Sequence, residues 1–286
     1  MFVILGYVIV IGSVLGGFAL AGGHIAALMQ PVELLMIGGA AAGAFLVGNT
    51  TKNVKATIKA LPTLLKGSKY SKAMYMELMS LHYEILNKIR KEGLMSIERD
   101  LESPAESPLF GKYPAVASDH HLIEFITDYL RLMVSGNLNP MEIENLMDNE
   151  IDTHHHEGLV PVGVIAKLGD GLPAFGIVAA VMGVVHTMAS VGLPPSELGL
   201  LIAHALVGTF LGILLAYGFV GPLSSLLEQK LDESTKMFQC IKVTLLASLN
   251  GYAPALAVEF GRKVLYSTER PTFSELEEHV KQGGKR

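Results

Sequence analysis

The sequence is poor in charge and in cysteine. Asp, Glu, Lys and Arg make up 17% of its 286 residues, whereas an ordinary soluble domain has about 25%. The single cysteine, Cys240, excludes any disulfide within the chain. The net charge of −5 gives no support for nucleic-acid binding, which needs a basic face. With 50% hydrophobic residues, this composition fits either a large soluble core or a membrane protein.

Basic residues are absent from two long stretches, and their distribution favours a membrane protein. All 22 Lys and Arg lie between Lys52 and Lys167 or between Lys230 and Arg286. The stretches without them contain four apolar segments, residues 2–22, 32–49, 169–192 and 198–222. Each is close to the roughly 20 residues that a helix needs to cross a bilayer core. The positive-inside rule then predicts four spans, with both basic regions in the cytoplasm.

The first apolar segment has an alternative reading. Ala19-Leu20-Ala21 followed by Gly22 resembles a signal-peptidase site. However, no basic residue precedes the segment, and its apolar run is longer than usual for a signal peptide. We therefore expect the segment to be retained as a span.

The region between the two predicted hairpins is helical in pattern. Residues 73–93 place apolar side chains at helical spacing and end on Gly93, a C-cap residue. Asn139 followed by Pro140 predicts another helix start. Because no strand pattern occurs, we predict an all-α membrane protein with four transmembrane helices and a helical cytoplasmic domain. Its parts are spans one and two (1–50), the cytoplasmic domain (51–168), spans three and four (169–223), and a cytoplasmic C-terminal helix and tail (224–286).

Catalytic and metal-binding motifs are missing. The sequence contains no P-loop, GxSxG or HExxH motif, so we expect no enzyme activity. His154, His155 and His156 are consecutive and point in different directions on a helix, so we expect a solvated helix end and no metal site. Asp119-His120-His121 resembles a phosphoesterase motif, but the further acids that this motif needs are absent.

The predicted spans also lack an acidic residue in their middle. Glu33 and Asp170 lie at the edges, and His186 and His204 lie ~9 Å below the outer turn, where we expect them to form a hydrogen-bonded pair. Since membrane proton relays use Asp, Glu or His, either nothing charged crosses or the helix of a partner supplies the acid. Near mid-membrane, Ala180 and Thr209 would suit a wall around such a helix.

Prolines and glycines mark further positions in the spans. Pro173 and Pro222 fall at the inner ends, where each is either a kink or a helix terminus. Gly12 and Gly16 are four residues apart, and so are Gly39 and Gly43. This spacing lets helices approach closely, within the chain or between copies.

Several long motifs resemble the MotA family of flagellar stator subunits. They are SKYSKAMYMELM at 68–79, VSGNLNPMEIENLMD at 134–148, LPAFGIVAAVMGVVH at 172–186, ALVGTFLGILLAYGFVGPL at 205–223 and LNGYAPALAVEFGRKVLYS at 249–267. The resemblance extends essentially end to end. It implies an inner-membrane protein that forms a pentamer around a MotB dimer, whose span carries the essential aspartate. Proton flow through that complex would drive torque on the rotor protein FliG, with protons as coupling ion and no other cofactor.

The resemblance also assigns roles to individual residues. It implies that rotor-facing charges lie at Arg90 and Glu98, supported by Glu150. Coupling prolines would be Pro173 and Pro222, and channel-facing positions Ala180 and Thr209. The resemblance also implies that alanine at position 180 favours protons over sodium. The alternatives are an energiser subunit similar to ExbB or TolQ, which has three spans, and a passive membrane scaffold.

Overall fold

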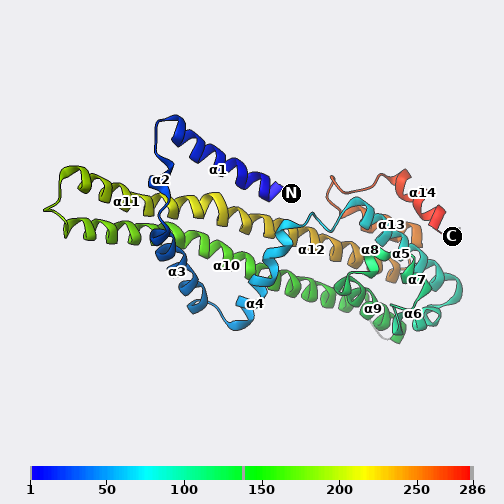
Figure 1. Ribbon diagram of the computed structural model, residues 1–286. Coiled ribbons are helices and arrows are strands. Elements are labelled where there is room, and N and C mark those ends of the chain that lie inside the picture. The colour runs from blue at the N-terminus through cyan, green and yellow to red at the C-terminus, as the bar shows by residue number, and fades with distance from the viewer. Residues whose placement is uncertain (1, 137–138, 284–286) are drawn as a thin grey trace. The chain divides into compact units, whose positions relative to one another are not determined.

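The computed structural model describes residues 2–136 and 139–283, and every regular element within these ranges is a helix (Figure 1). Four stretches are long and apolar enough to cross a membrane: Phe2–Leu20, Ile25–Val47, Pro140–Met188 and Pro195–Leu249. The predicted all-α class with four spans is therefore confirmed. The chain divides into two compact units, unit 1 (1–67 and 158–229) and unit 2 (68–157 and 230–286).

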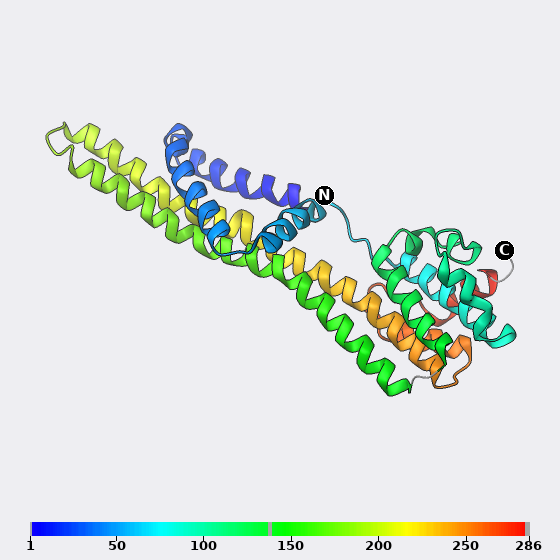
Figure 2. The same ribbon diagram turned by 90° about the horizontal axis from the view of Figure 1, so that it is seen from below.

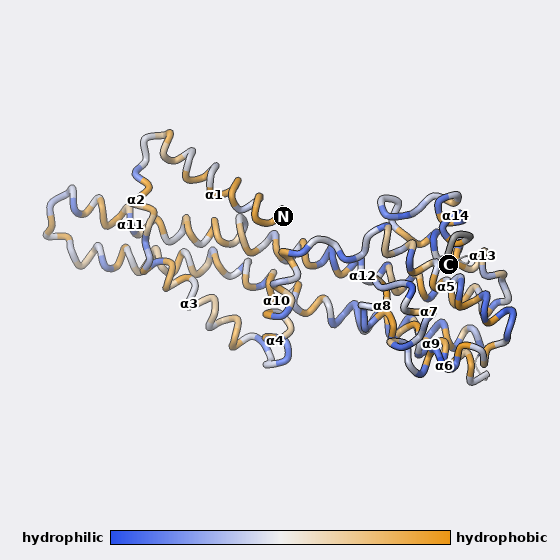
Figure 3. Tube along the Cα trace, turned by 45° about the vertical axis from the view of Figure 1, so that its right-hand side comes forward, coloured by the Kyte–Doolittle hydropathy of each residue, from blue (hydrophilic) through white to orange (hydrophobic). Residues whose placement is uncertain are grey.

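Unit 1 contains the apolar helices. Its elements are α1 (Phe2–Leu20), α2 (Ile25–Leu28), α3 (Pro31–Val47), α4 (Thr51–Ala60), the 3-10 helix η1 (Leu61–Leu65), the later part of α10 (Pro140–Met188), α11 (Pro195–Ile213), the π-helix η3 (Leu214–Val220) and the start of α12 (Gly221–Leu249). Figure 2 shows α10 and α11 side by side and antiparallel. Hydrophobic residues dominate these helices (Figure 3).

Glycines on facing surfaces let α10 and α11 approach closely. A Cβ atom on Gly176 would lie 2.7 Å from the carbonyl oxygen of Gly208 and 2.9 Å from the Cα of Gly212. A Cβ on Gly183 would lie 2.7 Å from that of Ala205. Glycine at positions 176 and 183 therefore permits an approach that any larger residue there would prevent.

The glycine pairs singled out from spacing alone do not make contacts of this kind. Within 4 Å of an added Cβ at Gly12, Gly16, Gly39 or Gly43, no atom of the described chain is found. Helix α1 likewise has no buried residue. The surfaces carrying these glycines are therefore open in the single chain.

Helix α3 packs against the hairpin through one face. Its buried residues are Glu33, Ile37 and Ala41, at successive intervals of four. Ile37 and Ala41 form an apolar cluster with residues of the hairpin and η3, namely Leu172, Ala179 and Ala216. The four-residue interval places all three α3 side chains on the same side of the helix.

Unit 2 has a larger hydrophobic core. Its elements are α5 (Lys72–Glu92), the 3-10 helix η2 (Leu94–Ile97), α6 (Glu98–Glu102), α7 (Pro108–Gly111), α8 (Pro114–Ala117), α9 (His120–Ser135), the start of α10, the later part of α12, α13 (Pro254–Lys263) and α14 (Phe273–Gly283). Tyr75, Tyr129, Phe110 and Phe125 are the largest fully buried side chains. Cys240 is buried in this core.

Local sequence signals set several helix ends in unit 2. Gly93 follows α5 with φ of 86°, which suits glycine. Asp119 caps α9 by accepting a hydrogen bond from the amide of Leu122. The Asn139 side chain accepts from the amide of Met141 at the start of α10. The predictions at Gly93 and Asn139 are thus confirmed.

Candidate functional site

The hairpin brings together the two positions expected near mid-membrane. Ala180 lies on α10, and Thr209 follows Gly208 on α11. A Cβ on Gly208 would lie 3.0 Å from the backbone nitrogen of Ala180. Counting residues from the outer turn placed Ala180 and Thr209 at similar depths, and the helix segments that carry them are indeed in close contact.

Pro173 lies inside a continuous helix. It occupies the interior of α10, which extends from Pro140 to Met188, and is half-buried. The reading of Pro173 as a helix terminus is therefore wrong. A proline inside a helix has no N–H for the carbonyl four residues earlier, here Gly169, which weakens the helix at this point.

Pro222 is the second residue of α12 and is exposed. The π-helix η3 directly precedes it, so Pro222 does not end the helical path. The Tyr7 hydroxyl of α1 donates a hydrogen bond of 3.0 Å to the carbonyl oxygen of Phe219, and the two rings pack 4.8 Å apart. Helix α1 thus contacts the π-helix through both a hydrogen bond and a ring contact.

Glu33 is the acidic group that sequence reasoning misplaced. Glu33 is only 8% exposed, and its Oε2 atom is buried without a hydrogen-bond partner among the described residues. A Cβ on Gly208 would lie 3.1 Å from this oxygen. Glu33 is in the first turn of α3, but that turn packs against α11 beside Gly208, at the level of Ala180.

The two intramembrane histidines do not pair. Within the described ranges, no hydrogen bond joins His186 to His204, and His186 is exposed. His204 is half-buried and close enough to Glu33 to interact with its carboxylate electrostatically. The expected histidine pair is therefore wrong.

The charges expected to face a rotor are available on unit 2. Arg90 lies in the last turn of α5 and Glu98 begins α6, and both are exposed. Neither forms an ion pair with another described residue. Both can therefore act on an outside partner.

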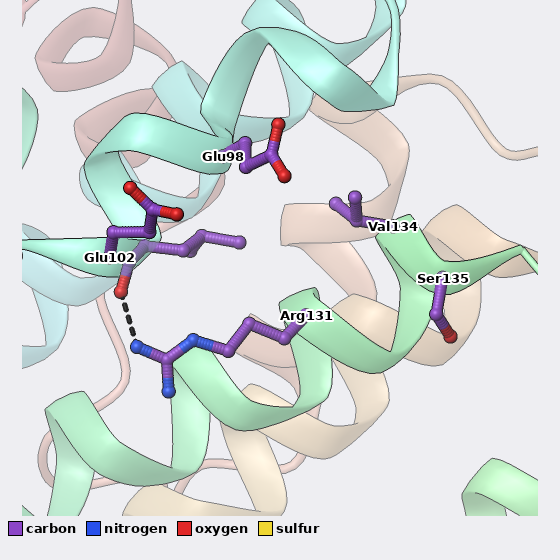
Figure 4. A pocket seen from close by; sticks show the side chains of 6 residues that line it. Glu98, Glu102, Arg131, Val134 and Ser135 are labelled. Atoms are coloured by element: carbon purple, nitrogen blue, oxygen red, sulfur yellow. Dashed lines mark hydrogen bonds between the residues drawn. The ribbon is translucent and has the colours of Figure 1, made fainter.

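Glu98 lines an open pocket of about 340 Å³ (Figure 4). Arg131 of α9 lines the same pocket, donates a hydrogen bond to the Leu101 carbonyl and pairs with Asp128 at 2.8 Å. Glu102 lies beside Glu98 on the pocket wall. The Arg131 guanidinium is thus held by its own unit, which leaves the Glu98 carboxylate unpaired.

Glu150 is exposed on α10 but held in place. Its Oε2 accepts a hydrogen bond of 2.7 Å from the hydroxyl of Tyr129. Burial raises the pKa of Tyr129, and the neighbouring Glu150 carboxylate raises it further. Glu150 is therefore a fixed acid, in contrast to Glu98.

The histidine run lies within α10 and not at a solvated helix end, so that expectation is wrong. His154 packs on Phe238 with ring centroids 4.7 Å apart, and burial lowers its pKa. His155 hydrogen-bonds Thr235 at 3.0 Å, while His156 is exposed and bonds the Asp152 carbonyl. The three side chains have three different environments, as their spacing predicts.

Residues 4–93 match the family described as Motility protein A N-terminal, and residues 117–240 match the MotA/TolQ/ExbB proton channel family. The chain is 60% identical to Motility protein A of Salmonella typhimurium over 281 residues, covering 98% of this chain and 95% of that protein. The chain belongs to the motility protein A family. Motility protein A of Escherichia coli is 58% identical over the same shares of both chains.

Two solved structures share the family fold. The structure titled C. jejuni MotAB superposes with a TM-score of 0.78 at 21% identity, covering 93% of this chain and 95% of that chain. The flagellar MotAB stator complex from Bacillus subtilis gives 0.76 at 23% identity, with 96% and 98% covered. As a member of a membrane proton channel family with four apolar spans, the chain is a multi-pass membrane protein.

Proposed function

We propose that the chain is a flagellar stator subunit that conducts protons together with a MotB-like partner and applies torque to a FliG-like rotor protein. The observation that carries this proposal is the 60% identity to a motility protein A over 98% of the chain. The match of residues 4–93 to the motility protein A N-terminal family favours this role over an ExbB- or TolQ-like energiser.

The membrane helices support assembly around a partner. Two solved relatives are titled as MotAB complexes, so a single-span MotB-like helix with a membrane aspartate is the proposed partner. In the part of the chain that the structure describes, no atom lies within 4 Å of a Cβ added at Gly12, Gly16, Gly39 or Gly43, which suits contacts to further copies. We propose a pentamer around a MotB dimer in the bacterial inner membrane, with unit 2 in the cytoplasm.

Protons are the proposed coupling ion. Each proton that crosses a potential of 100 mV releases ~2.3 kcal/mol, about four times RT. Such a step is large enough to bias a conformational change. In the proposed mechanism the prolines Pro173 and Pro222 make α10 and the α11–α12 connection deformable, so that protonation beside Ala180 and Thr209 shifts these helices.

Proton conduction should require both proteins. The chain and its partner are reconstituted in proteoliposomes, with the chain alone as control, and uptake is followed with a pH-sensitive dye. We expect flux only with the partner present. Equal flux from the chain alone would contradict the proposal, because the essential acid is assigned to the partner.

The rotor contact is tested by reversing charge. We expect Arg90→Glu with Glu98→Lys to abolish most swimming, because both unpaired charges then repel their rotor counterparts, and opposite changes on the rotor to restore it. Lys91→Glu with Glu92→Lys, at two neighbouring exposed residues, is the matched control. Normal swimming by the Arg90/Glu98 double variant would remove these residues from the interface.

A further inference from the structure

Glu33 has the surroundings of a group that binds and releases a proton. It is 8% exposed, so more than nine-tenths of it is already buried in the single chain. Contacts with further copies or a partner can only increase that burial. A carboxylate oxygen that is buried without a hydrogen-bond partner is costly when charged, in protein or in a membrane. A purely structural carboxylate would be expected to have such a partner.

The helices around Glu33 leave room for its carboxyl group. Gly208 has no side chain, and a Cβ there would approach Glu33 Oε2 to 3.1 Å. The same Cβ would approach the Ala180 nitrogen to 3.0 Å. The carboxyl group therefore lies beside the two helix segments that carry Ala180 and Thr209.

His204 is close enough to Glu33 for the two side chains to interact electrostatically. It lies on α11, one turn before Gly208. On α10, no titratable residue occurs between Asp170 and His186, and α2 (Ile25–Leu28) contains none. His204 is half-buried, and along α11 it lies between the turn before that helix and Gly208, the residue beside the Glu33 carboxyl group.

We propose that Glu33 is a second proton-binding site of the channel, located on this chain itself, with His204 as the group that passes protons to it from the outer side. The Glu33 carboxylate takes up one proton to become the neutral acid and releases the same proton toward the aspartate of the partner. No other bond forms or breaks. This inference rests on the proposed stator function and extends it.

Glutamine at position 33 removes the proton site and nearly preserves its shape. Glu33→Gln and Glu33→Asp are compared in the complete complex, with Glu197→Gln as control because Glu197 is an exposed acid in the first turn of α11. Proton flux is measured in proteoliposomes, and speed is measured in tethered cells. We expect Glu33→Gln to lower flux at least about tenfold, Glu33→Asp to retain part of it, and Glu197→Gln to equal the wild type.

A second measurement reads the site without relying on flux. In complexes whose partner carries Asn in place of its membrane aspartate, infrared difference spectra between acidic and alkaline buffer should still show a buried carboxyl group. Replacing Glu33 with Gln should remove that band, whereas His204→Gln should leave it and slow the flux of the otherwise wild-type complex. If no such band exists, Glu33 does not titrate and the inference fails, even where Glu33→Gln prevents assembly.

The outcomes separate the two proposals. Absence of flux in the wild-type complex would overturn the stator function itself. Flux in the wild type together with equal flux and speed in Glu33→Gln would overturn only the role of Glu33.

Discussion

The contact between Gly176 and Gly208 predicts a specific penalty for adding one methyl group. In Gly176→Ala the new Cβ would lie 2.7 Å from the Gly208 carbonyl oxygen, whereas ordinary contact begins at 3.4 Å. The helices must therefore separate locally by 3.4 − 2.7 = 0.7 Å. Because the opposing atoms belong to backbone, no side chain can rotate away.

The strain has a defined magnitude. Overpacking of this kind costs about 1–3 kcal/mol, while alanine gains about 1 kcal/mol over glycine in a helix. Gly163→Ala, on the same helix, gains the helix propensity of alanine without the overpacking, since none of the described atoms lies within 4 Å of its added Cβ. The difference between the two variants therefore isolates the strain.

The assay is thermal unfolding of the purified complex in detergent, paired with swimming speed. We expect Gly176→Ala to unfold several degrees below Gly163→Ala and to swim more slowly, because Ala180 lies one turn away on the displaced helix. Equal unfolding temperatures of the two variants would refute the close contact of α10 and α11.

Three further outcomes are expected. Burial lowers the pKa of His82 from 6.5 to about 4, so the unfolded chain binds a proton there at a higher pH than the folded protein does. The free energy of unfolding should therefore be unaffected by His82 above pH 6.5 and should fall by up to ~3 kcal/mol as the pH approaches 4. In His82→Gln this part of the pH dependence of unfolding should disappear, and an unchanged pH profile would contradict the prediction. Tyr129→Phe should release Glu150 and destabilise the protein by about 1 kcal/mol, measured by thermal unfolding, with Tyr83→Phe as a control that loses no described hydrogen bond. Pro173→Ala should restore the helical hydrogen bond to Gly169 and stabilise α10 yet reduce torque at high load, and full torque in motor recordings would refute a coupling role.

The sequence predicted the number of spans because each span is a stretch of about 20 apolar residues almost without charge, which can be recognised directly. Helix ends at Gly93 and Asn139 were equally accessible, since capping depends on neighbouring residues. The 49-residue length of α10 was not accessible from local rules, because Pro161 and Pro173 suggest breaks. Neighbouring helices stabilise such prolines, and that support comes from tertiary structure.

The packing partners could not be read from spacing. The interval of four at Gly12–Gly16 shows that one face is small, but it does not show what lies opposite. Gly176 and Gly208 are far apart in sequence, and only the pairing of α10 with α11 brings them together. The misplacement of Glu33 has the same cause, because its depth depends on where α3 crosses α11. One available signal was Pro31, which as the first residue of α3 places Glu33 inside the helix.

The π-helix η3 sets how far α11 is rotated relative to the start of α12. A π turn accommodates one residue more than an α turn, and each α-helical residue accounts for about 100° of rotation. Deleting one residue between Leu214 and Val220 would regularise the coil and turn α11 by about that angle against Gly221–Gln229. The direction in which Thr209 points therefore depends on the one extra residue of the π-helix, which the hydroxyl of Tyr7 contacts at Phe219.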